Sequence, residues 1–183
     1  MFAVTPRLLL RPGWPEDAEA LFATINDEAI VRNLARAPWP YRLEDARAFL
    51  SLPTDIASPR WLIFSRIGGP PTLVGCIGLD TLDNGDAELG YWIDRSFWGR
   101  GFATEAGMAV LENARTLGHR RLVASHFADN PASASVLRKL GFRPTGETVE
   151  RFSRGRGTSV PANGYACLLE DEQDSDLMRP LAA

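Results

Sequence analysis

The spacing of apolar residues changes within a short stretch near the middle of the chain. Residues 87–93 form a compact apolar run, which predicts a strand. In residues 102–117 the apolar positions recur every three or four residues, which predicts a helix that buries one face. Gly99 and Gly101 lie between the two segments. The pattern therefore predicts a strand, a glycine turn and a helix N-terminus in succession.

The same reasoning predicts the other elements. Helical spacing occurs in residues 15–25, from residue 43 onward and in residues 131–140. Short apolar runs bounded by turn residues predict strands at residues 8–11, 60–65, 72–79, 121–127, 143–152 and 160–169. A strand, a helix and a strand in sequence imply one right-handed parallel crossover, whereas the short turns elsewhere favour antiparallel pairing. We expect an α/β (α+β) fold with a mixed sheet.

Length and composition suit one packed domain. The chain has 183 residues, of which 45% are hydrophobic and 23% charged, so we expect a single domain over residues 1–183. A net charge of -3 and a single lysine, Lys139, provide no basic field for nucleic acid. No apolar run approaches membrane-spanning length and no leader pattern is present, so we expect a cytoplasmic protein without a membrane partner. Polar residues 171–183 should form a frayed tail.

The cysteines and histidines do not form a metal-binding pattern. Cys76 and Cys167 are too far apart for a disulfide framework or a zinc spacing, and each lies in an apolar run. We interpret them as buried thiols in a reducing compartment. His119 and His126 are the only histidines, and no carboxylate cluster flanks them at ligand spacing, so we predict no metal site.

The glycine turn is a candidate phosphate site. A helix N-terminus exposes backbone N–H groups without intrahelical acceptors and carries partial positive charge. Gly99 and Gly101 would let the backbone turn sharply and approach a phosphate, and Arg100 adds a charge. The alternative is a surface turn whose glycines only satisfy backbone angles. The stretch lacks the Gly-Lys-Ser/Thr of a triphosphate loop and the third glycine of the dinucleotide fingerprint.

Two separate motifs resemble the GCN5-related N-acetyltransferases, the GNAT family. Trp98-Gly-Arg-Gly-Phe-Ala103 resembles the Gln/Arg-x-x-Gly-x-Gly/Ala signature, with Trp98 where the signature has Gln or Arg. Asn130-Pro-Ala-Ser133, followed by Lys139-Leu-Gly-Phe142, resembles the Asn-x-x-Ser and Lys-x-Gly-Phe element of the branch with the ribosomal-protein N-terminal (RimJ/RimL-like) acetyltransferases. The resemblance covers about residues 5–170.

The resemblance implies a fold and an activity. The fold is a single-domain GNAT fold, with a mostly antiparallel sheet of six or seven strands flanked by about four helices. The fourth and fifth strands, which we place at residues 87–93 and 121–127, should splay apart so that pantetheine can enter. The co-substrate would be acetyl-CoA, without a metal. The acceptor would be a primary amine, of a protein N-terminus or a small molecule, that attacks directly in a ternary complex. A homodimer is compatible with the family.

The resemblance also implies a donor site. Backbone N–H groups of residues 89–93 would polarise the acetyl carbonyl. The residues expected to contact acetyl-CoA belong to the end of one strand, the glycine turn and two helix starts: Tyr91, Trp92, Ile93, Trp98, Gly99, Arg100, Gly101, Phe102, Ala103, Thr104, Asn130 and Ser133.

Glu88 and Ser133 are the candidate catalytic residues. Glu88 would accept a proton from the amine, with a pKa raised by partial burial; the alternative is a surface carboxylate paired with an arginine. Ser133 would protonate the leaving thiolate, or else only assist the helix cap. The tyrosine that many relatives carry in the following helix is absent. His126 could replace Glu88 as the base, but a lone histidine is more often a packed one.

The acceptor site is the least recognisable part. The family places it near the early helices, where Trp39 and Tyr41 are candidates, with His126 as a weaker one. An aromatic residue between prolines can equally be a plug against the sheet. Residues 153–159 form a glycine and arginine loop that could meet an acidic acceptor or the nucleotide end of the cofactor. We favour a mobile, solvated hairpin tip.

Two functions without catalysis remain as alternatives. A sensor that binds acyl-CoA would keep the phosphate turn and could dispense with Glu88 or Ser133. An interaction domain would expose Trp39, Trp61 and the arginine loop to a protein partner. The identity of the amine does not follow from the sequence.

Overall fold

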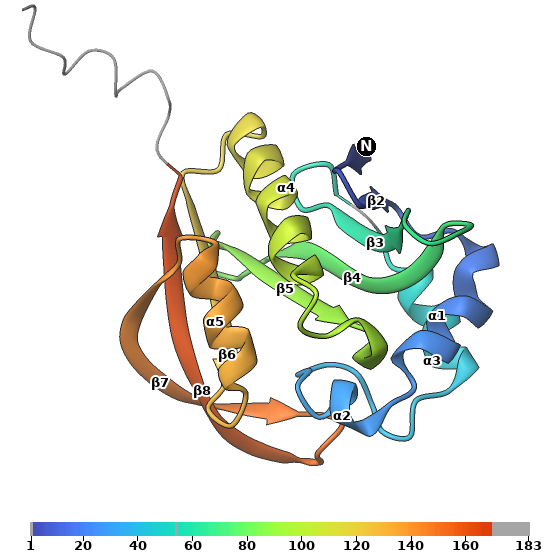
Figure 1. The fold of residues 1–183 in the computed structure, drawn as a ribbon. Coiled ribbons are helices and arrows are strands. Elements are labelled where there is room, and N and C mark those ends of the chain that lie inside the picture. The colour runs from blue at the N-terminus through green and yellow to red at the C-terminus, as the bar shows by residue number, and fades with distance from the viewer. Residues whose placement is uncertain (1, 54, 170–183) are drawn as a thin grey trace, which may run out of the picture.

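One twisted sheet with helices on both faces organises the molecule (Figure 1). The computed structural model describes residues 2–53 and 55–169. In this part the strands are β1 Ala3–Val4, β2 Leu8–Arg11, β3 Arg60–Ser65, β4 Thr72–Thr81, β5 Ala87–Ile93, β6 Arg121–Phe127, β7 Arg143–Ser153 and β8 Thr158–Leu168. The helices are α1 Ala18–Ile25, α2 Glu28–Val31, α3 Leu43–Leu50, α4 Phe102–Thr116 and α5 Pro131–Lys139, with 3-10 turns at Pro15–Asp17 and Arg95–Phe97.

The sheet is mixed and mostly antiparallel, as predicted. Its strand order is β1-β2-β3-β4-β5-β6-β8-β7, and among the described strands only β5 and β6 pair in parallel. Strands β2, β3, β5 and β6 have the predicted bounds. The sequence pattern misses β1 and α2, because two or four residues are too short to display a period. The predicted polar tail, residues 171–183, lies outside the described residues.

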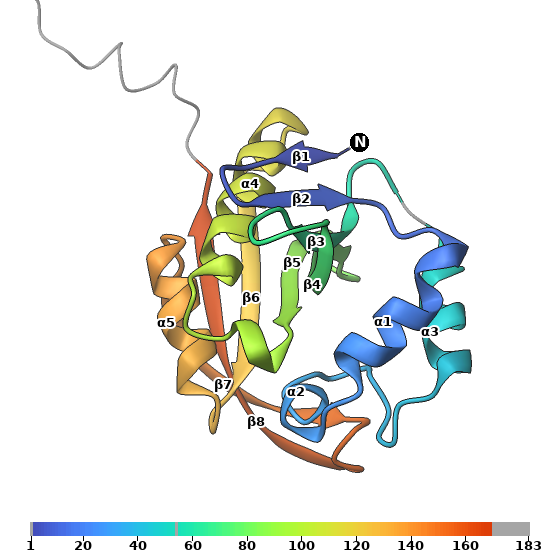
Figure 2. The ribbon, with the colours of Figure 1, turned by 45° about the vertical axis from the view of Figure 1, so that its right-hand side comes forward.

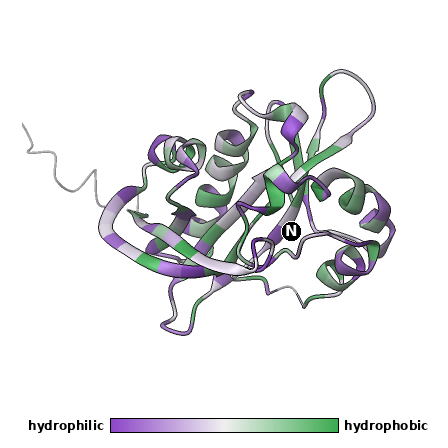
Figure 3. Ribbon diagram, turned by 90° about the horizontal axis from the view of Figure 1, so that it is seen from below, coloured by the Kyte–Doolittle hydropathy of each residue, from purple (hydrophilic) through white to green (hydrophobic). Residues whose placement is uncertain are grey.

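Two apolar layers enclose the sheet (Figure 2). Helices α4 and α5 cover one face, where Phe102 and Leu137 belong to the larger core cluster. Helices α1 and α3 cover the other face, where Leu21 and Ala46 belong to the second cluster. Figure 3 shows hydrophobic residues concentrated in the strands between these layers. Cys76 and Cys167 are both buried free thiols, which agrees with their interpretation.

Strands β5 and β6 are paired at one end only. Their parallel register consists of Ala87 with Leu122 and Glu88 with Val123. Strand β5 continues to Ile93 along β4, and β6 continues along β8, so each strand keeps its outer neighbour. The two strands therefore diverge beyond Glu88, and the predicted splay is confirmed.

The hairpin tip between β7 and β8 is exposed at Arg154 and at residues 157–159, as predicted, but it is anchored by hydrogen bonds that the sequence did not predict. The N–H group of Arg154 donates to the carbonyl oxygen of Ala35 at 2.8 Å. The side chains of Ser153 and Arg156 donate to carbonyl oxygens within residues 32–34 at 3.0 and 2.6 Å. The tip is thus attached to the connection between α2 and α3, because the long hairpin curves back under the sheet.

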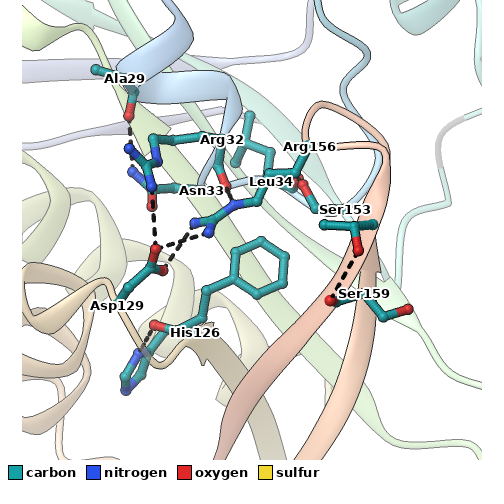
Figure 4. Close-up of polar contacts among 11 residues, drawn as sticks. Ala29, Arg32, Asn33, Leu34, His126, Asp129, Ser153, Arg156 and Ser159 are labelled. Carbon is teal, nitrogen blue, oxygen red and sulfur yellow. Dashed lines mark hydrogen bonds and ion pairs between the residues drawn. The ribbon is translucent and has the colours of Figure 1, made fainter.

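An ion-pair cluster completes this attachment (Figure 4). Both terminal nitrogens of Arg156 donate to Asp129, at 2.8 and 2.9 Å, and Arg32 of the segment after α2 approaches the same carboxylate at 3.3 Å. The hydrogen bonds from Arg156 lower the pKa of Asp129, which therefore stays ionised. Asp129 directly precedes α5, so the cluster joins the start of α5 to the hairpin tip and to the α2 region.

Gly75 is required for close packing of β4 against the end of β5. A Cβ atom at this position would lie 2.3 Å from the carbonyl oxygen of Trp92, a backbone atom. We expect Gly75→Ala to lower the free energy of unfolding by about 2 kcal/mol, because the strands must separate. Gly90→Ala is the matched control in β5, since its Cβ would meet nothing within 4 Å. Urea denaturation measures both, and equal stabilities of the two variants would contradict this account.

Candidate active site

A cavity of about 870 Å³ is lined from both faces of the sheet and includes the gap between β5 and β6. The lining on the α4 and α5 side contains the glycine turn and the start of α5. The lining on the α1 and α3 side contains residues 33–38, Tyr41 and Arg60. Its volume suits a small-molecule site. Two ligands could therefore approach one another through the sheet.

The start of α4 has the geometry of an anion site. Gly99 and Gly101 have φ angles of 75° and 79°, in the left-handed region that favours glycine. The backbone hydrogen bond from Glu105 N to Gly101 O, at 3.0 Å, starts the helix. The amides of residues 102–104 precede this bond and have no intrahelical acceptor. They can bind an anion at the positive end of a helix of 15 residues.

An ion pair between the β1–β2 connection and α4 holds the glycine turn in place. Arg7 Nε lies 2.6 Å from Glu105 Oε2, and a terminal nitrogen of Arg7 donates to the carbonyl oxygen of Arg100 at 2.9 Å. Thr5 Oγ1 donates to Glu105 Oε1 at 2.6 Å. Burial raises the pKa of Glu105, but the hydrogen bonds from Thr5 and Arg7 outweigh it and the pKa is lowered. The ionised Glu105 therefore ties the glycine turn to the β1–β2 connection.

The inner edge of β5 offers backbone groups to the gap. Asp94 N–H donates to Val74 O of β4 at 2.8 Å. Because successive residues direct their backbone groups to opposite edges, those of Tyr91 and Ile93 face β6. The register with β6 ends at Glu88, so the Tyr91 amide faces the open gap. Trp98 Nε1 donates to the carbonyl oxygen of Ile93 at 2.7 Å, which holds the end of the strand against the turn.

Ser133 and Tyr91 form a hydroxyl pair beside the gap. Their side-chain oxygens lie 2.8 Å apart, although the residues belong to α5 and β5. Burial raises the pKa of Tyr91 to about 12, with the hydrogen bond to Ser133 acting in the opposite direction, so the phenol keeps its proton at neutral pH. Asn130 Oδ1 accepts from Ser133 N–H at 3.2 Å, which confirms its N-cap role. Strand β5 thus provides the tyrosine that α5 lacks.

Glu88 is an ion-paired carboxylate. Its two oxygens accept hydrogen bonds from the two terminal nitrogens of Arg151, one of them at 2.8 Å, and Ser125 Oγ donates to it at 3.1 Å. Burial raises the pKa of Glu88, but the hydrogen bonds and charge of Arg151, together with Ser125, outweigh it and the pKa is lowered. The prediction of a raised pKa is therefore wrong. The alternative is right about the arginine partner but wrong about the surface position, because the Glu88 side chain is only 12% exposed.

His126 has one nitrogen without a partner. Its Nδ1 lies 2.8 Å from the carbonyl oxygen of Phe127, which can only accept, so the neutral ring carries its proton on Nδ1. The lone pair is then on Nε2, which is buried and has no hydrogen-bond partner among the described residues. His126 lines the cavity, and its ring lies 5.3 Å from that of Tyr165. Such a nitrogen can accept a proton or a hydrogen bond from a ligand.

The cavity gathers most of the residues that the sequence singled out. Trp39 and Arg100 are not in its lining; Trp39 is 36% exposed, and the Arg100 guanidinium lies 5.0 Å from the Phe97 ring centre. Both predicted contacts therefore lack support. The predicted residues in the lining are Tyr41, Glu88, Tyr91, Trp92, Ile93, Trp98, Gly99, Gly101, Phe102, Ala103, Thr104, His126, Asn130 and Ser133.

Sequence reasoning missed the charged partners of these residues. Asp80 and Arg151 both line the cavity, and Asp80 lies opposite Glu88 in the β4–β5 register. Asn84 and Gly85 form the turn between β4 and β5, so counting residues outward from this turn could have placed Asp80 opposite Glu88. Arg151 gave no signal, since it lies 63 residues from Glu88 in the chain.

The described part of the chain contains neither a cluster of metal-ligating side chains nor a membrane-spanning helix. Within residues 2–53 and 55–169, no group of three or more His, Cys, Asp or Glu side chains could hold a metal ion. No helix in the same ranges has both the length and the apolar character needed to span a bilayer.

Residues 7–143 match a family model described as an acetyltransferase (GNAT) domain. YoaA of Bacillus subtilis (strain 168), an uncharacterized N-acetyltransferase, is 31% identical over 175 residues, which cover 88% of this chain and 93% of YoaA. A ribosomal-protein-serine acetyltransferase of Escherichia coli (strain K12) is 36% identical over 73 residues, which cover 38% of this chain and 41% of that protein.

Solved structures share the fold. An acetyltransferase of the GNAT family from Bacillus anthracis superposes with a TM-score of 0.78 at 24% identity, covering 93% of this chain and 100% of that chain. RimL, a ribosomal alpha-N-protein acetyltransferase in complex with coenzyme A, gives 0.75 at 24% identity, with 92% and 98% covered. MccE, a self-immunity acetyltransferase in complex with acetyl-CoA and AMP, gives 0.71 at 21% identity, with 90% and 93% covered.

The Glu88–Arg151 pair should make stability depend on pH. Because the pKa of Glu88 is lowered in the folded state, the pair stabilises the fold fully above the ordinary glutamate pKa, and this contribution is lost as pH falls through the lowered value. At pH 7, Arg151→Met is expected to cost about 2 kcal/mol of unfolding free energy, because it leaves a mostly buried carboxylate unpaired. The difference from wild type should shrink below about pH 4.

Chemical denaturation at a series of pH values measures this difference. Arg47→Met on α3 is the control, because Arg47 is exposed and its loss should change stability by less than about 0.5 kcal/mol. An Arg151→Met deficit of the same size at pH 3 and pH 7 would exclude an ionised Glu88 as its cause.

Proposed function

Because this chain belongs to the GNAT family and is an acetyl-CoA-dependent N-acetyltransferase, we propose that it acetylates a primary amine by direct attack within a ternary complex. The amine belongs to a protein N-terminus or a small molecule. The observation that carries the proposal is the single cavity that joins both faces of the sheet through the gap between β5 and β6. Donor and acceptor can thus be bound at once, on opposite faces.

The α4 and α5 side of the cavity fits acetyl-CoA. When bound, this molecule supplies an acetyl group activated as a thioester. In our proposal the amides of residues 102–104 bind the pyrophosphate, and the open edge of β5 binds the pantetheine amides. The left-handed glycines of the turn and the unpaired edge at Tyr91 support this arrangement, since each offers backbone donors without protein acceptors.

The Tyr91 amide is our candidate for stabilising the acetyl carbonyl oxygen. It faces the gap and is fixed by the pairing of β5 with β4. A donor that is already oriented stabilises developing negative charge without reorganisation. The sequence led us to expect that backbone N–H groups of residues 89–93 polarise the acetyl carbonyl, and we now assign this role to the Tyr91 amide at the centre of the gap.

We assign the proton acceptor to His126 rather than to Glu88. Nε2 of His126 has a free lone pair in the cavity wall, whereas Glu88 already accepts hydrogen bonds from Arg151 and Ser125. Because the His126 ring lies on the α4 and α5 face with Tyr165, His126 takes the proton of the amine across the gap, through a water molecule. Its ring faces Tyr165 of β8, and Lys139 of α5 is the cation that lines the cavity from that side.

Ser133 is our proton donor for the leaving thiolate. Either oxygen of the Tyr91–Ser133 pair can be the donor, and in our proposal the protonated Tyr91 phenol donates to Ser133 while the Ser133 hydroxyl donates to the thiolate. A hydroxyl of ordinary acidity is a modest acid by itself, so the second hydroxyl strengthens the assignment. In this proposal Glu88 and Arg151 do not transfer protons, and their ion pair instead helps to orient the acceptor.

An interaction domain is less well supported than an enzyme. Trp61, one of the aromatic residues that such a domain would expose, is 1% exposed. A sensor would not need a second arm of the cavity on the opposite face. A panel of amines incubated with acetyl-CoA tests the enzyme directly, by release of thiol. Thermal stabilisation by acetyl-CoA without thiol release from any amine would favour the sensor.

The hydroxyl pair gives a kinetic prediction. Ser133→Ala is expected to lower kcat by about 100-fold and Tyr91→Phe by about 10-fold, because the thiolate then leaves without a well-placed proton. The Kd for acetyl-CoA, from calorimetry, should stay within about threefold for both variants. Ser159→Ala, an exposed serine of β8, is the control. A rise in Kd that accounts for the whole loss would assign both hydroxyls to binding.

The assignment of the base is tested by two variants. His126→Gln should lower kcat by about 100-fold or more, because the cavity wall then lacks the imidazole lone pair that accepts the proton of the amine. Glu88→Gln should lower kcat by less than about 10-fold, because Glu88 is already paired with Arg151. Steady-state rates with saturating acetyl-CoA and amine measure both. The reverse ranking, with the larger loss of kcat in Glu88→Gln, would return the role of base to Glu88.

A further inference from the structure

The acceptor arm of the cavity carries an excess of positive charge. By the acceptor arm we mean the lining on the α1 and α3 side. Its charged members are three carboxylates, Asp45, Asp80 and Glu88, and four arginines, Arg36, Arg60, Arg151 and Arg154. The whole chain has a net charge of -3, so this excess is local.

The two carboxylates nearest the gap already have partners. Glu88 is held by Arg151, and Asp80 lies between Arg36 at 3.1 Å and Arg60 at 3.5 Å. An ammonium group entering here would compete with arginines that are already in place. The arm is therefore not built to select an acceptor by positive charge alone.

Asp45, the third carboxylate, is also engaged. Its Oδ2 accepts from the backbone N–H of Arg42 at 2.9 Å, at the start of α3. It serves as a helix-start partner, where an acidic side chain is favourable. None of the three carboxylates pairs with Arg154.

Arg154 is an exposed arginine of the arm whose side chain has no partner among residues 2–53 and 55–169. Its backbone is fixed by the bond from its N–H to Ala35 O at 2.8 Å. The next residue, Gly155, is packed so closely that a Cβ atom there would lie 2.6 Å from Val31 Cγ1. The Arg154 side chain lines the cavity, and no ion pair or hydrogen bond joins it to another described residue. Arg156 of the same tip is instead bound to Asp129.

We propose, on the basis of the proposed function, that the acceptor bears a carboxylate close to its amine and that Arg154 binds this carboxylate. A guanidinium on a fixed backbone can hold a carboxylate through two parallel hydrogen bonds. The amine of the same molecule then reaches the gap at Glu88 and Tyr91. Arg154 is attached to residues 33–38, on the other face of the sheet from the glycine turn, which favours the acceptor over a cofactor phosphate.

The carboxylate can come from two sources. It is the α-carboxylate of a free amino acid, or an acidic side chain at the start of a peptide. Each source has a neutral partner of nearly equal size. Glycine is compared with glycinamide, and a peptide amide that begins with Glu is compared with one that begins with Gln.

The experiment measures kcat/KM of the wild type and of Arg154→Gln for both pairs. For the pair that matches the natural acceptor, the wild type should prefer the acid by about 10-fold or more, because a charge-assisted bidentate contact is lost with the amide. Arg154→Gln should abolish this preference and leave the KM for acetyl-CoA unchanged. Arg143→Gln, an exposed arginine of β7 outside the cavity lining, should keep it.

Binding of the products provides a readout that does not depend on turnover. Calorimetry should detect tighter binding of N-acetylglycine than of N-acetylglycinamide, or of the acetylated Glu peptide than of the Gln peptide, only while Arg154 is present. An unchanged acid preference in Arg154→Gln would overturn the proposal. An increased KM for acetyl-CoA would instead assign Arg154 to a cofactor phosphate. Thiol release from neutral amines without any preference for acids would refute the proposal and leave the proposed function intact.

Discussion

The early end of the β5–β6 pairing is the constraint on which the rest of the site depends. Only Ala87 and Glu88 of β5 have partners in β6. A continuous ladder would satisfy the backbone of Tyr91 with protein groups and would close the passage between the two faces. Because β4 and β8 hold the two strands along their outer edges, the gap opens without unfolding either strand. A buried amide without a partner costs free energy, so this edge favours a ligand that supplies acceptors.

Arginine–carboxylate pairs fix the walls around the gap. Each pair joins segments that are far apart in the chain, and each carboxylate lies in or beside an element of the site. The pairs are Arg7 with Glu105, Arg151 with Glu88 and Arg156 with Asp129. The planar guanidinium orients its partner as well as attracting it, so these pairs contribute to position more than to net stability. The glycine turn, the centre of the gap and the segment after α2 are held in this way.

Those parts of the site could be predicted whose geometry depends only on residues nearby in the sequence. The glycine turn was predictable because left-handed angles at Gly99 and Gly101 are a local requirement, and Asn130 was predictable because an N-cap bonds three residues ahead. The raised pKa expected for Glu88 was wrong for the opposite reason. Its protonation state depends on Arg151, and that contact arises only when β5, β6 and β7 assemble. The hydroxyl pair of Ser133 and Tyr91 is non-local in the same sense.

The sequence alone therefore determined the periodic elements, the caps, the glycine turn and, through two motifs, the family. Each of these depends on residues within about one helical turn or one strand of each other, where spacing reports geometry directly. Tertiary structure was needed to assign a tyrosine to Ser133, an arginine to Glu88 and a second arginine, Arg7, to Glu105. These contacts join side chains that lie 42, 63 and, for the ion pair behind the glycine turn, 98 residues apart. No local period reports them, because they arise only from the packing of separate elements.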